Sequence, residues 1–161
     1  MPHGIIEDRK RIEAIIKKAV FFHVAFSVDD QPYAVPMNYG YANGVFYIHS
    51  KPTGKKLELL SQNPKVAFSL QTDVKPLHDA DKAENCTMAY LSVMGEGTAE
   101  RVTNTDEKII ALDAICEQYD LPPYEYDDKM LNTIAILKIL PTSMTGKWGN
   151  VDCDQYFETN S

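Results

Sequence analysis

The chain lacks the features on which several protein classes depend. Its three cysteines, Cys86, Cys116 and Cys153, are odd in number and show no Cys-x-x-Cys spacing, which argues against a disulfide framework and a zinc site. The longest apolar run, Ala19 to Phe26, is interrupted by His23 and is far too short to cross a bilayer. The N-terminal residues contain no apolar segment of a signal peptide. We therefore expect a cytoplasmic protein with reduced thiols.

Basic charge is also scarce. The 16 Lys and Arg residues face 23 Asp and Glu, which gives a formal net charge of −7, so nucleic acid and anionic membranes are not expected partners. No Ser-His-Asp order, P-loop or GxGxxG motif is present, and hydrolase and Rossmann-type functions therefore lack support. The 161 residues, 44% of them hydrophobic, are typical of one globular domain with a true core.

Apolar spacing predicts the elements of the N-terminal half. A helix within residues 1–20 has a single apolar stripe, and strands at 20–28, 33–39 and 45–50 are expected to form a three-stranded meander, with a tight turn at Asn43-Gly44. Pro36 cannot donate a hydrogen bond to a neighbouring strand. Its strand is therefore expected at an edge, at a bulge or facing a ligand.

The C-terminal half alternates strands and helices. We predict a helix at 54–62, a strand at 65–71, a polar excursion at 72–86 and a long strand at 87–101, in which Gly95 and Gly97 suggest a bulge or bend. A helix at 105–119 capped by Thr105, one or two helical turns at 127–131, and a strand at 133–140 ended by Pro141 follow, with a tail at 141–161. The fold class is mainly β with α: about six antiparallel strands in a small barrel with peripheral helices.

One basic cluster stands out against the acidic background. His49 and Ser50 end a predicted strand, and Thr53 and Gly54 lead into a helix whose first turn carries two lysines. Lysines at a helix start oppose the macrodipole, and a bound phosphate removes that conflict. For either lysine alone the alternative is a solvated surface side chain. For the whole cluster we predict an anion site, formed by His49, Ser50, Thr53, Gly54, Lys55 and Lys56.

Several segments, in a fixed order along the chain, carry a resemblance to a known family. They are PYAVPMNYGY at 32–41, YIHS…GKKLELL at 47–60, NPKV at 63–66, YLSVMGEGTA at 90–99, the helix opened at 107–108, and TGK at 145–147. In these segments the chain resembles the pyridoxamine 5′-phosphate oxidase-like, FMN-binding split-barrel proteins. Within that family it looks most like the nitroimidazole-resistance (Nim) branch.

The resemblance implies one flavin-binding split-barrel domain over residues 1–161, in a homodimer with two flavin sites at the interface. It assigns the flavin phosphate to Lys55 and Lys56, and phosphate or ribityl contacts to His49 and Ser50. The backbone of Pro36, Met37, Asn38 and Tyr39 is expected along the flavin ring. Trp148, in the tail near the dimer interface, is expected to close the pocket from the second subunit, together with Lys147.

The resemblance also implies the chemistry. FMN is the expected cofactor, with FAD as the alternative, and it transfers hydride between NAD(P)H and a small acceptor, which for a Nim-like protein is a nitro group. No side-chain nucleophile or metal is then needed. The family often has arginine in the phosphate cluster, whereas this chain has lysines, which lack the bidentate fork. Arg101 is the last arginine, so pyridoxamine phosphate is not the expected substrate.

Other interpretations stay open at this point. The chain could be a non-catalytic dimeric module that holds flavin, or haem through His23 or His49, for sensing or storage. A deazaflavin is a third cofactor choice. A metal site in the 72–86 excursion is a weaker alternative to a solvated loop, because the spacing of its candidate ligands matches no established site: His78, Asp79, Asp81 and Cys86.

Overall fold

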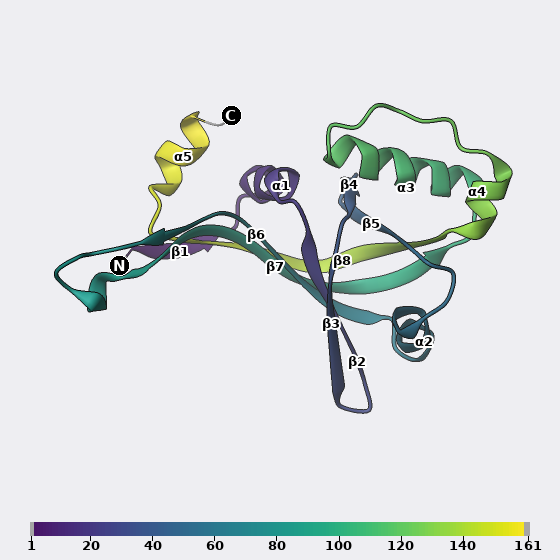
Figure 1. The fold of residues 1–161 in the computed structure, drawn as a ribbon, viewed down its shortest axis with the longest axis horizontal. Coiled ribbons are helices and arrows are strands. Elements are labelled where there is room, and N and C mark those ends of the chain that lie inside the picture. Colours follow the sequence, from purple (N-terminus) through teal and green to yellow (C-terminus); the bar gives the residue numbers. More distant parts are fainter. Residues whose placement is uncertain (1, 160–161) are drawn as a thin grey trace. The chain divides into compact units, whose positions relative to one another are not determined.

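The structure is a computed structural model that describes residues 2–159 (Figure 1). The predicted class is confirmed, because the described residues form mainly antiparallel β-structure with helices added to it. The sheet formed by the described residues has eight strands rather than the predicted six. The strands are β1 His3–Ile6, β2 Phe22–Val28, β3 Gln31–Met37, β4 Gly40–Ala42, β5 Val45–Ser50, β6 Lys65–Leu77, β7 Thr87–Val102 and β8 Ala135–Gly149. The helices are α1 Arg9–Lys18, α2 Lys55–Gln62, α3 Thr105–Gln118, α4 Asp128–Thr133 and α5 Cys153–Thr159, with a short 3-10 turn, η1, at Ala83–Asn85.

The order of strands differs from the predicted meander. Hydrogen-bonded neighbours follow the order β3-β2-β6-β7-β8-β5-β4, and β1 pairs with β8. The β2–β3 and β4–β5 hairpins therefore lie at opposite ends of the order, and a three-stranded meander of 20–28, 33–39 and 45–50 is wrong. Strands that follow each other in the chain usually pair, and β5 does pair with β4, but its other partner is the distant β8 and not β3. The expectation of an edge position for Pro36 is met, because β3 pairs only with β2 in this order.

The described chain divides into two compact units. The first unit contains the residues up to Ala19, Ser69–Met94 and the residues from Met144 on; the second contains Val20–Phe68 and Gly95–Ser143. The long strands β6, β7 and β8 contribute residues to both units.

In the first unit, α1 packs through an apolar stripe. Ile12, Ile15 and Ile16 are at most 4% exposed, and the Asp8 carboxylate caps the helix by accepting a hydrogen bond from the Arg11 amide at 2.9 Å. The helix predicted within 1–20 is shorter than expected because residues 3–6 form β1, which pairs with the end of β8.

The predicted end of the last strand is also wrong. β8 runs through Pro141 to Gly149, since proline removes one donor but still adopts extended backbone. The tail predicted at 141–161 is thus mostly strand, followed by α5; residues 160 and 161 lie outside the described residues. An ion pair of 2.8 Å between Arg11 and Asp154 joins α5 to α1.

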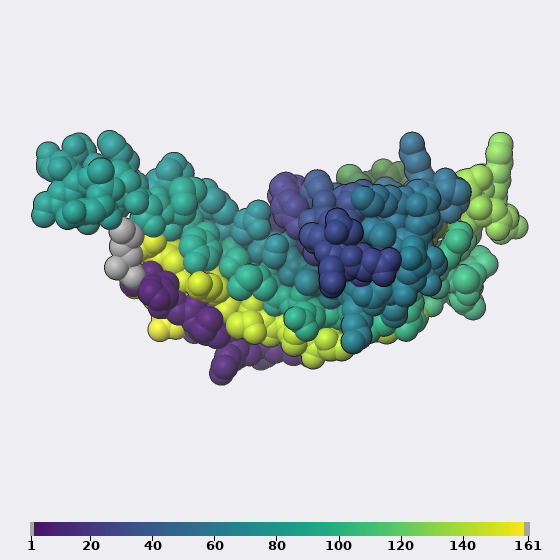
Figure 2. All heavy atoms as spheres, turned by 90° about the horizontal axis from the view of Figure 1, so that it is seen from below, coloured from purple at the N-terminus to yellow at the C-terminus, as the bar shows by residue number. Residues whose placement is uncertain are grey.

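The excursion predicted at 72–86 is smaller than expected. β6 continues to Leu77, and η1 lies in the connection that leads to β7. The tip of the β6–β7 hairpin, which contains η1, forms the teal projection in Figure 2. Among the described residues no helix combines the length and apolar character needed to cross a membrane.

The second unit has an aromatic core. The ring centroids of Phe22 and Tyr39 are 4.7 Å apart, those of Phe22 and Phe46 5.3 Å, and those of Phe46 and Phe68 4.9 Å. Such spacings are those of favourable aromatic pairs. Phe22, Tyr39 and Phe46 are fully buried, so this cluster packs the start of β2, the residue before β4 and strand β5 against one another.

Helix α3 covers β4 and β5 in the same unit (Figure 1). Its N-cap is Asn104, whose side chain accepts from the Glu107 amide at 3.0 Å, and not the predicted Thr105. Gly40 permits the closest approach of α3 and β4, because a Cβ there would lie 2.3 Å from the backbone carbon of Ala114. This glycine therefore serves close packing.

The long strand predicted at 87–101 is present as β7, Thr87–Val102, with Gly95 and Gly97 inside it, and the bulge or bend suggested for these glycines stays a prediction. A Cβ at Gly95 would lie 2.3 Å from the carbonyl oxygen of Ser143, and one at Gly97 would lie 2.6 Å from that of Leu140. Both glycines thus allow close contact with β8.

Candidate functional site

The corner between β5 and α2 brings the predicted anion-binding residues close together. Phe46 and Ile48 of β5 are fully buried, whereas His49 and Ser50 at its end are half-buried. Pairing with β8, in the register His49 to Ile136 and Ser50 to Ala135, fixes this end of the strand. The exposed residues 51–54 then lead directly into α2.

The first turn of α2 has amide groups suited to an anion. Its N-cap, Gly54, offers no side-chain hydrogen bond to the helix, and the Gly54 carbonyl accepts from the amides of Leu57 and Glu58 at 2.9 and 3.2 Å. The amides of Lys55 and Lys56 precede this first bond, and such amides have no partner inside a helix. They are available to a ligand that approaches the helix end.

Gly54 itself has a backbone that other residues rarely adopt. Its φ of 124° and ψ of 171° lie in a region almost restricted to glycine. A Cβ at this position would meet no atom within 4 Å, so the space on the Cβ side of Gly54 is open. The glycine is required by the backbone path, and the open space leaves room for an anion.

The two lysines occupy different surroundings. Lys55 is exposed, and its ammonium nitrogen lies 4.4 Å from the ring centroid of Tyr33 on β3, a cation–π distance. Lys56 is half-buried and close enough to His49 to influence its ionisation. Figure 2 shows the dark blue tip of the β2–β3 hairpin beside α2, in line with the Lys55–Tyr33 contact.

Burial and the Lys56 charge lower the pKa of His49 below its ordinary value of 6.5. The imidazole is therefore neutral at pH 7 in the protein alone. A phosphate placed between His49 and Lys56 would offset the effect of the Lys56 charge on the His49 pKa, because a nearby anion stabilises the protonated ring. The corner thus combines the positive charge of Lys56 with an imidazole whose protonation a nearby anion would favour.

The segment predicted to follow the flavin ring, residues 36–39, spans the end of β3. Pro36 pairs with His23 and is exposed, while Met37 pairs with Phe22 and is half-buried. Asn38 is exposed in the connection to β4. Tyr39 differs from the others, because its side chain is fully buried and its amide donates to the Tyr119 hydroxyl at 3.0 Å.

Trp148 lies on β8 in the first unit, whereas the β5–α2 corner belongs to the second. It pairs with Gly4 of β1 and is half-buried. A Cβ at Gly4 would lie 2.7 Å from the indole nitrogen, so the ring covers this glycine. The contact with β1 gives Trp148 a packing role of its own, and its predicted part in the flavin pocket stays a prediction.

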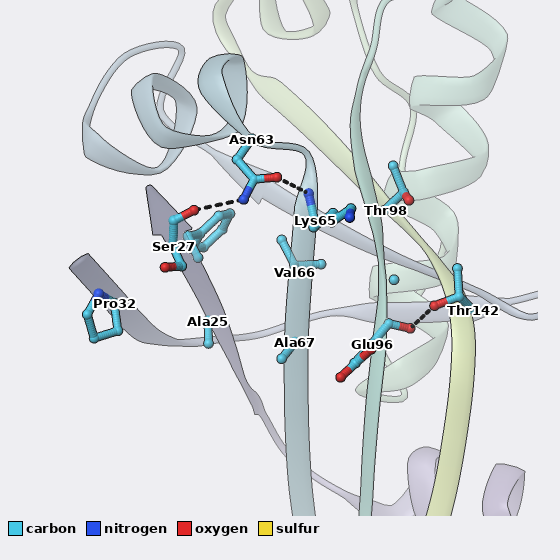
Figure 3. Close-up of a pocket in the computed structure, with 12 residues that line it drawn as sticks. Ala25, Ser27, Pro32, Asn63, Lys65, Val66, Ala67, Glu96, Thr98 and Thr142 are labelled. Atoms are coloured by element: carbon cyan, nitrogen blue, oxygen red, sulfur yellow. Dashed lines mark hydrogen bonds between the residues drawn. The ribbon is translucent and has the colours of Figure 1, made fainter. Parts of the chain in front are cut away.

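A pocket of about 550 Å³ in the second unit was missed by sequence reasoning (Figure 3). The Asn63 side chain connects its walls, donating to the Ser27 carbonyl at 2.8 Å and accepting from the Lys65 amide at 3.1 Å. Residues of five strands, β2, β3, β6, β7 and β8, form the rest of the lining. Its lining residues are Ala25, Phe26, Ser27, Pro32, Asn63, Lys65, Val66, Ala67, Glu96, Gly97, Thr98 and Thr142.

The alternative metal site finds no support in the described part of the chain. No group of three or more metal-ligating side chains is present within residues 2–159. Asp79 instead holds the hairpin tip together by accepting hydrogen bonds from the Asn85 side chain at 2.6 Å and from the amides of Asp81 and Lys82. His78 and Cys86 lie near each other, with 3.6 Å between Nδ1 and Sγ.

The sequence of this chain is similar to those of known proteins. Residues 8–148 match the family model described as pyridoxamine 5′-phosphate oxidase. A curated relative, an uncharacterised protein of Rhizobium meliloti (strain 1021), is 29% identical over 65 residues, which are 40% of this chain and 42% of that protein.

Solved structures are similar over most of the chain. A proposed 5-nitroimidazole antibiotic resistance protein from Bacteroides thetaiotaomicron is 33% identical, with a TM-score of 0.81 over 91% of this chain and 87% of that one. The FAD and heme binding protein from Mycobacterium smegmatis is 20% identical, with a TM-score of 0.78 over 98% and 80% of the two chains. The flavocytochrome Anf3 from Azotobacter vinelandii is 18% identical, with a TM-score of 0.73 over 95% and 75%. At these lower identities the last two show the fold alone.

Proposed function

Because the chain belongs to the pyridoxamine 5′-phosphate oxidase family, we propose that it is a flavin-binding oxidoreductase that acts as a homodimer. FMN is the proposed cofactor, with its phosphate at the β5–α2 corner. The observation that carries the proposal is the combination at this corner: a helix start with no side-chain cap, open space at the Gly54 Cβ position, and two lysines in the first turn, of which Lys56 lies close to a neutral histidine.

The residues at the corner fit a phosphate group. The amides of the first turn and the Lys56 ammonium group would hold the anion, and His49 would gain a proton or donate a hydrogen bond on binding. The Lys55 ammonium group would leave the Tyr33 ring to bind the phosphate, or would contact the ring and the phosphate together. Ser50, at the end of β5, supplies a hydroxyl for a phosphate or ribityl oxygen.

When bound, the flavin supplies hydride transfer, and the protein contributes orientation and electrostatics. In this proposal Pro36, Met37 and Asn38 follow the ring, where their position next to the paired end of β3 keeps the backbone fixed. The acceptor is a small molecule, and similarity to the Bacteroides thetaiotaomicron protein favours a nitro compound. Trp148 is proposed to close the site from the second subunit.

The test begins with the purified protein. Apoprotein is titrated with FMN, FAD and haem, followed by anaerobic reduction with NADH or NADPH and then addition of a nitroimidazole. The proposal predicts tight FMN binding, reduction by a nicotinamide, and reoxidation by the nitro compound. Haem binding with no flavin affinity, or flavin that no reductant reaches, would favour the non-catalytic module and contradict the proposal.

A further inference from the structure

A tyrosine outside the predicted site holds two backbone segments of the second unit together. Tyr119 follows the last turn of α3, and its hydroxyl accepts from the Tyr39 amide at 3.0 Å while it donates to the Val20 carbonyl at 2.7 Å. Val20 precedes β2, and Tyr39 lies between β3 and β4. One hydroxyl thus links the beginning of one strand to the end of the next.

Both backbone groups lie where the ladder between β2 and β3 ends. The last paired residues are Phe22 and Met37, so neither the Val20 carbonyl nor the Tyr39 amide belongs to this pairing. The whole Tyr39 residue is buried, and a buried amide that lacks an acceptor costs free energy of folding. Tyr119 supplies the acceptor for one group and the donor for the other.

The hydroxyl is held by a rigid support. A few residues before Tyr119, the backbone of Ala114 approaches Gly40 so closely that no Cβ would fit between them. Ala114 and Ile115 are buried against the core, which keeps the end of α3 in place. Burial raises the pKa of the Tyr119 phenol above its ordinary value, so the hydroxyl keeps the proton that it donates to Val20.

We propose that Tyr119 is a positioning residue for the flavin, because its hydroxyl holds the Tyr39 amide and thereby fixes the end of the Pro36–Asn38 segment along which the ring is proposed to lie. This inference rests on the proposed function. It also assigns the Tyr39 amide to Tyr119, so that contacts to the ring come from the residues before Tyr39. A site held by a second, rigid layer of hydrogen bonds keeps its geometry more exactly than a free loop does.

The test compares Tyr119→Phe with Tyr126→Phe in the full chain. Both variants remove one tyrosine hydroxyl from the second unit, but Tyr126 bonds to the side chains of Asp113 and Cys116 and not to the proposed site. We measure FMN affinity, the midpoint potential of bound FMN, thermal unfolding, and hydrogen exchange of the Tyr39 amide. Loss of a purely structural bond would lower thermal stability without moving the potential.

For Tyr119→Phe we expect about tenfold weaker FMN binding, the size of one lost hydrogen bond, together with a shifted potential and faster exchange at Tyr39. Tyr126→Phe should leave all three unchanged. If wild type binds FMN and Tyr119→Phe shows the same affinity and potential, the inference is wrong while the proposed function stands. If wild type binds no flavin, the proposed function and this inference both fail.

A second measurement does not depend on the variant folding. In wild-type protein the Tyr39 amide should gain no more protection from exchange on FMN binding than other buried amides of the second unit do, since Tyr119 is its partner in both states. A gain confined to Tyr39 would mean that the amide bonds to the flavin, and would overturn the assignment.

Discussion

Replacing Lys55 and Lys56 together by alanine separates ligand binding from folding stability. Each lysine is proposed to make a charge-assisted hydrogen bond to the flavin phosphate, worth about 1.5–3 kcal/mol. Two such bonds to one phosphate are not independent, and Lys55 is exposed to solvent that screens its charge. We therefore expect a loss of about 3 kcal/mol, or about 100-fold in FMN affinity.

The same variant should fold as well as the wild type. Loss of the contact between Lys55 and the Tyr33 ring costs about 0.5–1 kcal/mol at an exposed site. Removal of two positive charges from the first turn of α2 gains about 0.3–1 kcal/mol each, because lysines there oppose the helix dipole. These contributions oppose each other, so the free energy of unfolding should change by no more than about 1.5 kcal/mol.

The assay is fluorescence titration of apoprotein with FMN at low salt, and urea unfolding of the same samples. The control is Lys75→Ala with Lys82→Ala, which makes the same change in net charge at exposed residues of the first unit. The control should bind FMN within about twofold of wild type. If the Lys55 and Lys56 variant binds FMN as tightly as the control does, the phosphate is bound elsewhere and the reasoning is refuted.

Three further substitutions test the site and its support. His49→Gln should remove a pH dependence of folding stability. Because the folded-state pKa of His49 lies below the unfolded-state value of 6.5, the free energy of unfolding of ligand-free wild type falls as the pH drops below 6.5. Urea unfolding at several pH values should show a flatter profile for the variant. Because the phosphate of FMN also gains a proton over this range, the pH profile of affinity is compared with that of the variant. Wild-type FMN affinity should rise relative to that of His49→Gln as the pH drops, since the phosphate stabilises the protonated ring, and equal profiles would exclude His49 from the phosphate site. Gly54→Ala should cost about 1–3 kcal/mol through its backbone alone, because a Cβ there meets no atom within 4 Å; unchanged unfolding would contradict the observed backbone angles. Asn104→Ala should cost about 1 kcal/mol by thermal or urea unfolding and Thr105→Ala much less, and the reverse order would restore the cap predicted from sequence.

Local signals predicted the β5–α2 corner well. The Asn43-Gly44 turn, the apolar run of β5 and the stop at Asn63-Pro64 are all properties of short segments, and the structure has β5 and α2 within one residue of the predicted bounds. The predicted cap of α3 was wrong by one residue because Asn104 and Thr105 are both good N-cap residues, and composition alone does not separate them.

Long-range pairing is what the sequence left undetermined. The partner of β5 is β8, whose residues follow some ninety positions later, and no local pattern identifies it. The same holds for the link between Tyr39 and Tyr119, which are 80 residues apart. Pro141 favours a strand end and so predicts a tail that contains Trp148, whereas pairing with β1 extends β8 well past that proline.

A phosphate bound at the start of α2 is the central feature of the proposed site. A crystal structure of the FMN-loaded protein tests this directly. We predict phosphate oxygens within hydrogen-bonding distance of the Lys55 and Lys56 amides and of His49, with the flavin ring along residues 36–38. A structure with FMN bound elsewhere, and only water before Gly54, would contradict the account.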